Sequence, residues 1–128
     1  MSVRTVMTAA AAAAVVGLAA SAASAGETER GRLFLSVSGS HSTWIRGVQL
    51  HCPHTGGHHP HAAAACSQLG RAHGEPGAVA GDRHLCTREY DPVTATAEGE
   101  WNGRTLLWRK TYPNACALDS ETGPLFRF

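Results

Sequence analysis

One short stretch of the chain places a basic residue between two features that restrain the backbone. It reads Cys86-Thr87-Arg88-Glu89-Tyr90-Asp91-Pro92. Cys86 offers a covalent tie on the upstream side, while Pro92 fixes its own φ and favours an extended Asp91. A segment held at both ends and extended between them has the shape that a protease cleft binds. One function that this shape allows is that of a decoy, in which Arg88–Glu89 is a peptide bond offered to a serine protease and held too rigidly for rapid cleavage.

Histidines offer a second kind of chemistry, because neutral imidazole is a good ligand for zinc, copper or nickel. A metal-binding protein is therefore the alternative function. Flexible glycines separate the candidate ligands, and no carboxylate lies between Cys52 and Cys66 to orient a ring. We expect an exposed loop without a physiological metal site. Five of the eight histidines form this cluster: His51, His54, His58, His59 and His61.

Catalysis by the chain itself is the third alternative. An enzyme of this kind would need a serine or cysteine nucleophile beside a base and an orienting carboxylate. The sequence has no recognisable arrangement of that type. We expect a protein that is not an enzyme and that uses no cofactor.

The first 25 residues have the composition of a secretory signal. Arg4 supplies a weak basic region, residues 9–20 form an apolar run of small residues, and Ala23-Ser24-Ala25 gives a small-x-small cleavage pattern. The run is too short and too weakly apolar to span a bilayer of about 30 Å. We predict cleavage after Ala25, which leaves one domain over residues 26–128, secreted and extracellular.

The charge of the predicted mature chain is balanced. Without Arg4, ten basic and ten acidic residues remain. Such a balance argues against nucleic acid or an anionic membrane as the main partner.

The four cysteines predict two disulfides, since an even number in an exported chain is typical of a disulfide framework. Three pairings are open, and counting alone does not choose among them. Each bridge would stabilise the fold by about 3–4 kcal/mol on the loop-entropy model. A zinc site is disfavoured because no Cys-x-x-Cys pair occurs. The residues concerned are Cys52, Cys66, Cys86 and Cys116.

Hydrophobic periodicity predicts strands and one clear helix. Apolar residues alternate over 33–38 and over 47–52, as in strands with one buried face. Residues 62–71 combine strong helix formers with an i,i+3 apolar pair, which predicts a helix. The chain end, 125–128, alternates again and predicts a last strand that buries its phenylalanines.

A hairpin over residues 93–112 is the strongest local prediction. Asn102-Gly103 supplies the two positive φ angles that a type I′ turn requires. A two-residue turn places Trp101 opposite Arg104 and Ala97 opposite Trp108. Neither face of the return strand is cleanly polar, so we expect a helix on one face and a second subunit on the other. The fold class is α+β: an antiparallel sheet of about five strands, one or two helices on one face, and two disulfides.

From Leu33 to Phe128 the chain resembles the Streptomyces subtilisin inhibitor family of secreted bacterial protease inhibitors. Motifs spread over almost all of the predicted mature chain carry the resemblance. They are Leu33-x-Leu35-x-Val37, Val48-x-Leu50-x-Cys52, His59-Pro60 with Cys66, Cys86-x-x-x-Tyr90-Asp91-Pro92-Val93, Gly99-x-Trp101-x-Gly103, Asn114-x-Cys116 and Phe126-x-Phe128.

The resemblance implies disulfides Cys52–Cys66 and Cys86–Cys116, a homodimer formed through the sheets, and a reactive bond after the second residue past Cys86. That bond is Arg88–Glu89. The partners it implies are subtilisin-like and, because of the arginine, trypsin-like serine proteases.

Roles for the neighbouring residues follow from their positions relative to that bond. Arg88 would enter the primary specificity pocket, where an acidic group of a trypsin-like enzyme pairs with its guanidinium. Leu85 would fill a hydrophobic secondary pocket, Thr87 is small enough to lie near the catalytic imidazole, and Tyr90 would contact the leaving-group side.

Overall fold

The structure is a computed structural model that describes residues 10–14, 17, 30–53 and 56–128. The predicted secretory signal, residues 1–25, lies outside the described residues except for 10–14 and 17. Cleavage after Ala25 therefore stays a prediction. In the described part of the chain, no helix is both long and apolar enough to cross a bilayer.

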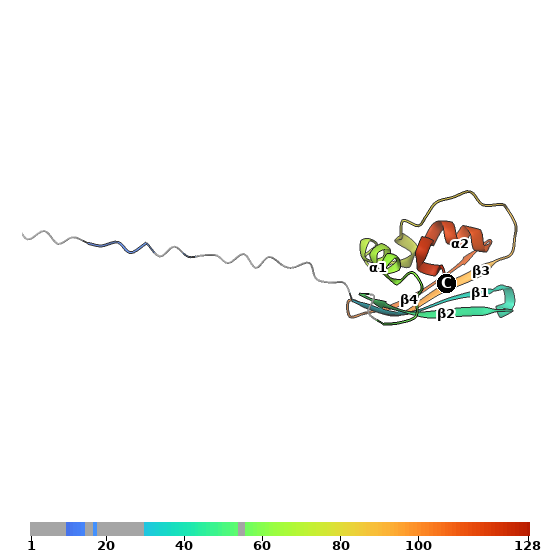
Figure 1. Cartoon of the computed structure of the whole chain (residues 1–128), viewed down its shortest axis with the longest axis horizontal. Coiled ribbons are helices and arrows are strands. Elements are labelled where there is room, and N and C mark those ends of the chain that lie inside the picture. Colours follow the sequence, from blue (N-terminus) through green and yellow to red (C-terminus); the bar gives the residue numbers. More distant parts are fainter. Residues whose placement is uncertain (1–9, 15–16, 18–29, 54–55) are drawn as a thin grey trace, which may run out of the picture.

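Among the described residues, four strands form one antiparallel sheet in the order β2-β1-β3-β4 (Figure 1). Period-two alternation decides which face of β1 is buried, as predicted: Leu33, Leu35 and Val37 are at most 7% exposed, while Phe34 between them is 43% exposed. The short 3-10 turn Ser40–Ser42 joins β1 to β2. The strand bounds are β1 Gly31–Gly39, β2 Ile45–Cys52, β3 Val93–Trp101 and β4 Arg104–Tyr112.

The predicted hairpin is confirmed in both turn and register. Asn102 and Gly103 have φ angles of 48° and 78°, the positive values that a type I′ turn requires. Trp101 pairs with Arg104 and Ala97 with Trp108. The same register pairs Val93, the first residue of β3, with Tyr112, and so positions the downstream end of the loop described below.

Two helices cover the same face of the sheet (Figure 1). Helix α1 spans Ala62–Arg71, as predicted, and α2 spans Ala115–Thr122. Helix α2 was not predicted from the sequence, although its ends carry ordinary capping signals. The Asn114 side chain accepts a hydrogen bond from the Ala117 amide, and Gly123 follows the last turn with a φ of 54°. The 3-10 turn Pro76–Ala78 lies between α1 and the loop that leads to β3.

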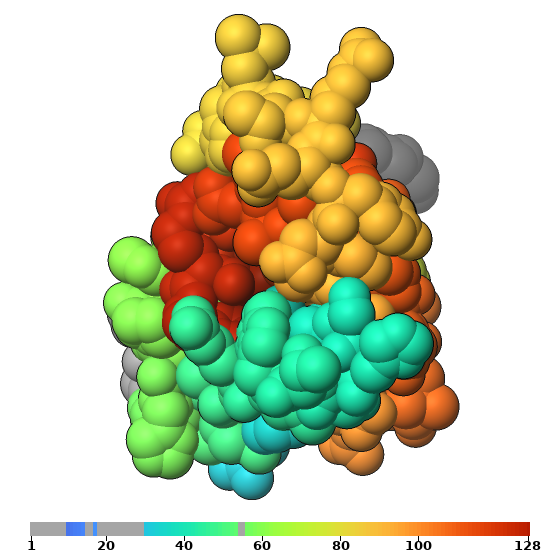
Figure 2. Space-filling model, turned by 90° about the vertical axis from the view of Figure 1, so that its right-hand side faces the viewer, coloured from blue at the N-terminus to red at the C-terminus, as the bar shows by residue number. Residues whose placement is uncertain are grey.

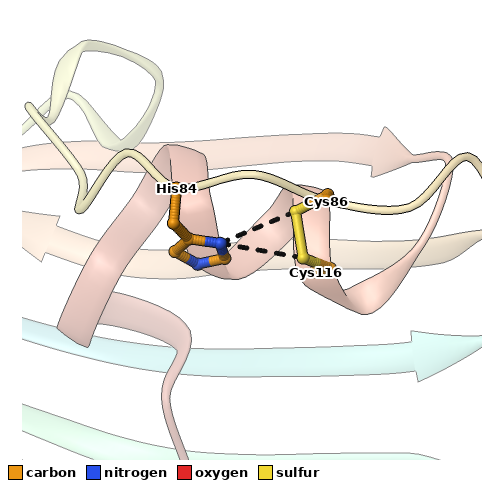
Figure 3. Close-up of side chains that lie close together, drawn as sticks. All are labelled: His84, Cys86 and Cys116. Atoms are coloured by element: carbon orange, nitrogen blue, oxygen red, sulfur yellow. Dashed lines mark hydrogen bonds between the residues drawn. A yellow bond between two sulfur atoms is a disulfide. The ribbon is translucent and has the colours of Figure 1, made fainter.

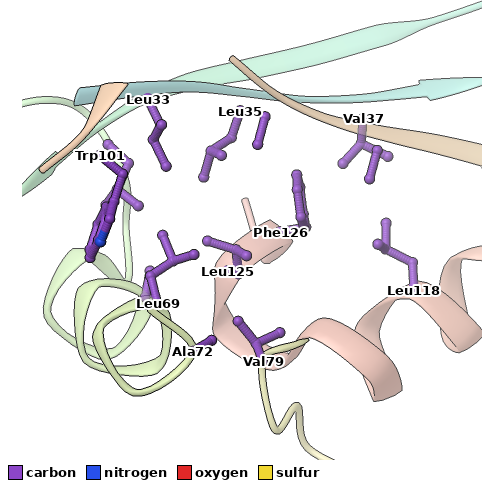
Figure 4. Packing of buried hydrophobic residues seen from close by; sticks show 14 of the residues in the cluster. Leu33, Leu35, Val37, Leu69, Ala72, Val79, Trp101, Leu118, Leu125 and Phe126 are labelled. Atoms are coloured by element: carbon purple, nitrogen blue, oxygen red, sulfur yellow. The ribbon is translucent and has the colours of Figure 1, made fainter. Parts of the chain in front are cut away.

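The core lies between the sheet and these helices (Figure 4). Leu33 and Leu35 project from the sheet towards Leu69 of α1 and Leu125 beyond α2, and each of these side chains is at most 1% exposed. Burial of such apolar surface contributes roughly 25 cal/mol per Å². The same packing holds α1 and α2 in fixed positions on the sheet.

The predicted fifth strand is wrong, because Gly123–Phe126 form a 3-10 turn. Pro124 cannot donate a ladder hydrogen bond, and its fixed φ suits the turn that continues from α2. The Leu125 carbonyl instead accepts a hydrogen bond from Nε2 of His59 at 2.8 Å. Phe126 is buried, as predicted, but it stacks on Trp108 of β4 at a centroid distance of 5.6 Å. The chain end therefore lies on the sheet face rather than along its edge.

Candidate functional site

Residues 79–92 connect the turn Pro76–Ala78 to β3 without helix or strand structure, and we call them the exposed loop. Figure 2 shows part of this loop, in yellow to orange, as the outermost projection of the molecule. Leu85 is 99% exposed and Tyr90 82%. Thr87, Arg88 and Glu89 are exposed as well. The structure therefore places all of the predicted protease-contacting residues on one protruding segment.

The two disulfides implied by the resemblance are both present. Cys52–Cys66 joins β2 to α1, and Cys86–Cys116 joins the exposed loop to the first turn of α2. Because α2 packs on the core through Leu118, the second bridge ties the loop to a rigid element. The prediction of a covalent brace just upstream of Arg88 is confirmed.

Asn114 holds the middle of the exposed loop by a contact that no sequence pattern predicted. Its Nδ2 atom donates to the carbonyl oxygens of Thr87 at 3.2 Å and of Glu89 at 2.8 Å. These two carbonyls flank Arg88. The same side chain caps α2 through Oδ1, which accepts from Ala117. One buried amide thus couples the start of a helix to the backbone on both sides of Arg88.

The downstream end of the loop is held by backbone groups. The Asp91 amide donates to the Pro113 carbonyl at 2.9 Å, and Ser40 Oγ donates to the Pro92 carbonyl at 3.3 Å. Val93, the first residue of β3, is then buried in the sheet. The chain after Glu89 is therefore anchored independently of the Cys86–Cys116 disulfide.

The upstream end is held by the last turns of α2. The Asp82 amide donates to the Ser120 carbonyl at 3.0 Å. The His84 amide donates to Ser120 Oγ at 3.1 Å, and that hydroxyl donates in turn to the His84 carbonyl at 3.3 Å. Two residues of the loop are thereby fixed to α2 before the disulfide is reached.

His84 also takes part in an exposed charged cluster with Asp119 and Arg127. Its Nε2 atom lies 2.8 Å from Asp119 Oδ2, and the Arg127 guanidinium binds both carboxylate oxygens of Asp119, at 2.8 and 3.1 Å. The hydrogen bonds to Asp119 and to the Leu85 carbonyl raise the pKa of His84. The hydrogen bonds from Arg127 and His84 hold the pKa of Asp119 below its usual value.

The histidine-rich segment has a structural role at His59. This side chain is 7% exposed; Nε2 donates to the Leu125 carbonyl and Nδ1 accepts from the His61 amide at 2.9 Å. Burial lowers its pKa, so the neutral ring is favoured. Of the other candidates, His54 lies outside the described residues. Within the described part of the chain, the histidines of this segment belong to no group of three potential ligands within 4.8 Å of one another.

Sequence reasoning missed the residues that hold the exposed loop: Asn114, Ser120, Asp119 and Arg127. Asn114 belongs to one of the family motifs, but neither its type nor its position predicts contact with residues 25 and 27 positions upstream. A cap preference at the start of α2 was the one available signal. The other contacts depend on how α2 lies against the loop.

The fold and the site define a class: a small disulfide-bonded α+β domain that presents an exposed loop braced against a helix. A family model described as subtilisin inhibitor-like matches residues 29–114. This chain belongs to that family. The resemblance found in the sequence motifs is thereby confirmed.

Relatives and a solved structure agree with this assignment. A subtilase-type protease inhibitor of Streptomyces coelicolor is 45% identical over 86 residues, 66% of this chain and 60% of that protein. The match thus covers less than two thirds of that relative. Subtilisin inhibitor-like protein 3 of the same species is 44% identical over 66% of this chain and 80% of its own length. Both names describe inhibitors and not enzymes, in agreement with the prediction of a protein that is not an enzyme.

A solved structure matches the fold with a TM-score of 0.60 and 31% sequence identity. It is Streptomyces caespitosus sermetstatin in complex with Bacillus licheniformis subtilisin, and the match covers 78% of this chain and 99% of that one. Together with the two disulfides of this chain, the match confirms the α+β architecture, with four strands among the described residues in place of about five.

Proposed function

We propose that this chain inhibits serine proteases by offering Arg88–Glu89 as a scissile bond that is bound tightly and cut slowly. The observation that carries the proposal is the position of Arg88. Its neighbours' carbonyls are fixed by Asn114, while the side chains around it are exposed. A protease can therefore engage this segment without ordering it first, and pre-ordering reduces the entropic cost of binding.

Slow net cleavage follows from the anchors on the two sides of the bond. A serine protease attacks the carbonyl of Arg88 with its activated hydroxyl and stabilises the oxyanion. After cleavage, the upstream end would stay tied through Cys86–Cys116, and the downstream end through Asp91 and β3. The new amine is then kept beside the acyl group, so the bond reforms before the ends separate.

Two classes of target fit the exposed side chains. Arg88 suits the acidic primary pocket of a trypsin-like enzyme, and Leu85 offers an apolar side chain to a hydrophobic secondary pocket. Support for subtilisin-like targets comes from sermetstatin, the matched protein, which was crystallised with a subtilisin. Thr87 and Tyr90 would contact the enzyme on the two sides of the scissile bond.

The test is titration of subtilisin and of trypsin with the purified mature chain. We expect stoichiometric loss of both activities. Arg88→Gly should abolish trypsin inhibition and weaken subtilisin inhibition less. The matched control is Arg83→Gly, an exposed arginine of the same loop, which should inhibit like the wild type. Rapid digestion of the chain, or inhibition of both enzymes unaffected by Arg88→Gly, would reject the proposed bond.

We also propose a homodimer through the outer face of the sheet, the face opposite α1 and α2. Phe34, Ile45 and Leu107 lie there and are 43%, 65% and 75% exposed. Burial of such side chains against a second copy favours association. Sedimentation velocity should give a dimer that Leu107→Lys weakens. A monomer at all concentrations would contradict this proposal.

Export is the remaining part of the proposal. The composition of residues 1–25 supports a cleaved secretory signal. Sequencing the N-terminus of the protein from culture medium should give Gly26 as the first residue. Retention of the protein inside the producing cells would contradict export.

A further inference from the structure

The ring of His84 lies among groups that accept hydrogen bonds and have no proton to donate. Its Nε2 atom is 2.8 Å from Asp119 Oδ2, and its Nδ1 atom is 3.3 Å from the Leu85 carbonyl oxygen. Nδ1 also faces the Cys86–Cys116 bridge, 3.7 Å from each sulfur (Figure 3), and disulfide sulfurs carry no proton. Both ring nitrogens must therefore be protonated for both hydrogen bonds to form, which makes the ring an imidazolium.

The charged groups around His84 balance when its ring is protonated. Asp119 of α2 and Asp82 of the exposed loop face it with two carboxylates, and the Arg127 guanidinium binds both of them. An imidazolium completes two positive and two negative charges. The hydrogen bonds to Asp119 and to the Leu85 carbonyl raise the pKa of His84 from 6.5. The charged ring therefore persists to a higher pH in the folded protein than in the unfolded chain.

The hydrogen bond from Nδ1 fixes a part of the exposed loop whose own side chain does not hold it. The Leu85 carbonyl belongs to the peptide group that joins Leu85 to Cys86, so this bond sets the orientation of that peptide plane. The Leu85 side chain is 99% exposed and does not pack on the core. The His84 backbone is itself held by Ser120 of α2 through its amide and its carbonyl. The ring thus links α2 to the residue three positions upstream of Arg88.

We propose that His84 is a positioning residue of the inhibitor: its doubly protonated ring ties the Leu85 carbonyl to Asp119 and so holds the segment upstream of Arg88 in the shape that a protease binds. This role rests on the proposed function, in which the exposed loop enters a protease cleft. Loss of one ring proton breaks the tie. Asp119 keeps the proton on Nε2, because a charge-assisted hydrogen bond is the stronger of the two. The bare lone pair of Nδ1 then faces the Leu85 carbonyl oxygen and repels it.

The effect of pH on this tie has a definite sign. Because the pKa of His84 is raised in the folded protein, the contribution of the charged ring is complete below pH 6.5 and is lost as the pH rises through the folded pKa. The His84 and Asp119 side chains are 38% and 36% exposed, and water and salt weaken an ion pair at such a site. We therefore expect a modest contribution of His84 to protease affinity, a factor of about two to five.

NMR titration of the free mature chain, labelled with ¹⁵N and ¹³C, tests the ring without a protease. Between about pH 6 and 9, we expect both ring nitrogens of His84 to stay protonated beyond pH 6.5. The carbonyl ¹³C shift of Leu85 should change with the same midpoint. Asp119→Asn removes the facing charge and should move both midpoints towards 6.5. A ring that loses its proton at or below pH 6.5, or a Leu85 shift that does not follow the ring, would overturn the proposal.

Inhibition of subtilisin by the wild type and by His84→Gln, at pH 6.5 and at about pH 9, tests the consequence for binding. Glutamine reaches Asp119 but does not titrate, and dividing its Kd by that of the wild type cancels the titration of the enzyme. We expect a ratio of about two to five at pH 6.5 and close to one at the higher pH. The matched control, His58→Gln at an exposed histidine far from α2 in sequence, should give a ratio of one throughout.

Failure of the role of His84 and failure of the proposed function give different results. If the wild type inhibits subtilisin but the ratio for His84→Gln does not change with pH, the role of His84 is overturned while the inhibitor function stands. If the wild type inhibits neither subtilisin nor trypsin at any pH, the proposed function itself is overturned. Because His84 lies outside the core, the variant should keep an unfolding midpoint close to that of the wild type, which urea denaturation checks.

Discussion

The Nδ2 atom of Asn114 lies 2.8 Å from the carbonyl oxygen of Glu89, the residue that follows the proposed scissile bond. The same nitrogen reaches the Thr87 carbonyl, while the Oδ1 atom caps α2. Asn114 therefore has two separable roles: Oδ1 caps α2, and Nδ2 restrains the exposed loop. Substitutions that remove one of these interactions at a time can measure the contribution of each.

Replacing Asn114 by serine should loosen the exposed loop and leave the helix cap. Serine caps helices about as well as asparagine, but it has no amide to reach the loop carbonyls. Two lost hydrogen bonds cost about 1–3 kcal/mol, and one or two kcal/mol corresponds to a factor of about 5–30. We expect hydrolysis of Arg88–Glu89 by trypsin to accelerate by such a factor, measured by mass spectrometry.

Asn114→Ala is the companion variant. It should lose the cap as well, and so reduce the free energy of unfolding by about a further 1 kcal/mol, measured by urea denaturation. Equal cleavage rates for the wild type and both variants would show that Asn114 does not restrain the loop.

Leu85→Ala should weaken protease binding without affecting the stability of the free protein. The side chain is 99% exposed, so it contributes nothing to the core. If it becomes buried in an enzyme pocket, loss of its methyl and methylene groups costs about 2 kcal/mol, or roughly a 30-fold rise in Kd for subtilisin. Leu107→Ala, exposed on the outer sheet face, is the matched control and should leave this Kd unchanged. Identical Kd values for both variants would place Leu85 outside the interface.

Gly99→Ala should destabilise the sheet severely. Gly99 has a φ of 146°, and a Cβ there would overlap the backbone carbonyl of Arg32 on β1. The backbone conformation alone costs about 1–3 kcal/mol for a residue with a side chain, and the overlap adds to it. Gly103→Ala is the control: its φ is 78°, but no atom lies within 4 Å of the added Cβ, so the cost should be about 1–2 kcal/mol. Urea denaturation measures the loss in free energy of unfolding for both variants. A smaller loss for Gly99→Ala than for Gly103→Ala would contradict the proposed overlap with β1.

The buried imidazole of His59 should make the protein less stable in mild acid. Its pKa is lowered from 6.5 in the folded state by burial, so the unfolded chain takes up a proton at a higher pH than the folded protein. The contribution of the neutral His59 ring to the free energy of unfolding is therefore complete above pH 6.5, and it is lost as the pH falls through the folded pKa. Urea denaturation between pH 8 and 5 should show this loss, and His59→Gln should show less of it. If the free energy of unfolding changes with pH in the same way for the wild type and for His59→Gln, His59 does not cause the loss of stability in acid.

Local patterns predicted much of the fold because their causes are local. The alternation in β1, the helix α1 and the Asn102-Gly103 turn each depend on residues within a few positions of one another. The chain end shows where this reasoning fails. Residues 125–128 alternate as a strand would, yet Pro124 and the contacts with His59 and Trp108 hold the chain as a turn on the sheet face.

The sequence by itself determined the family, the strands of the hairpin, and the identity of the exposed segment around Arg88. It did so because each motif and each turn is made of residues that lie close together along the chain. Only the tertiary structure decided what holds that segment. Asn114, Ser120 and His84 act across 25 to 36 positions of sequence, since packing of α2 on the core brings them together. Distances of that kind follow from the packing of whole elements, and no local pattern encodes them.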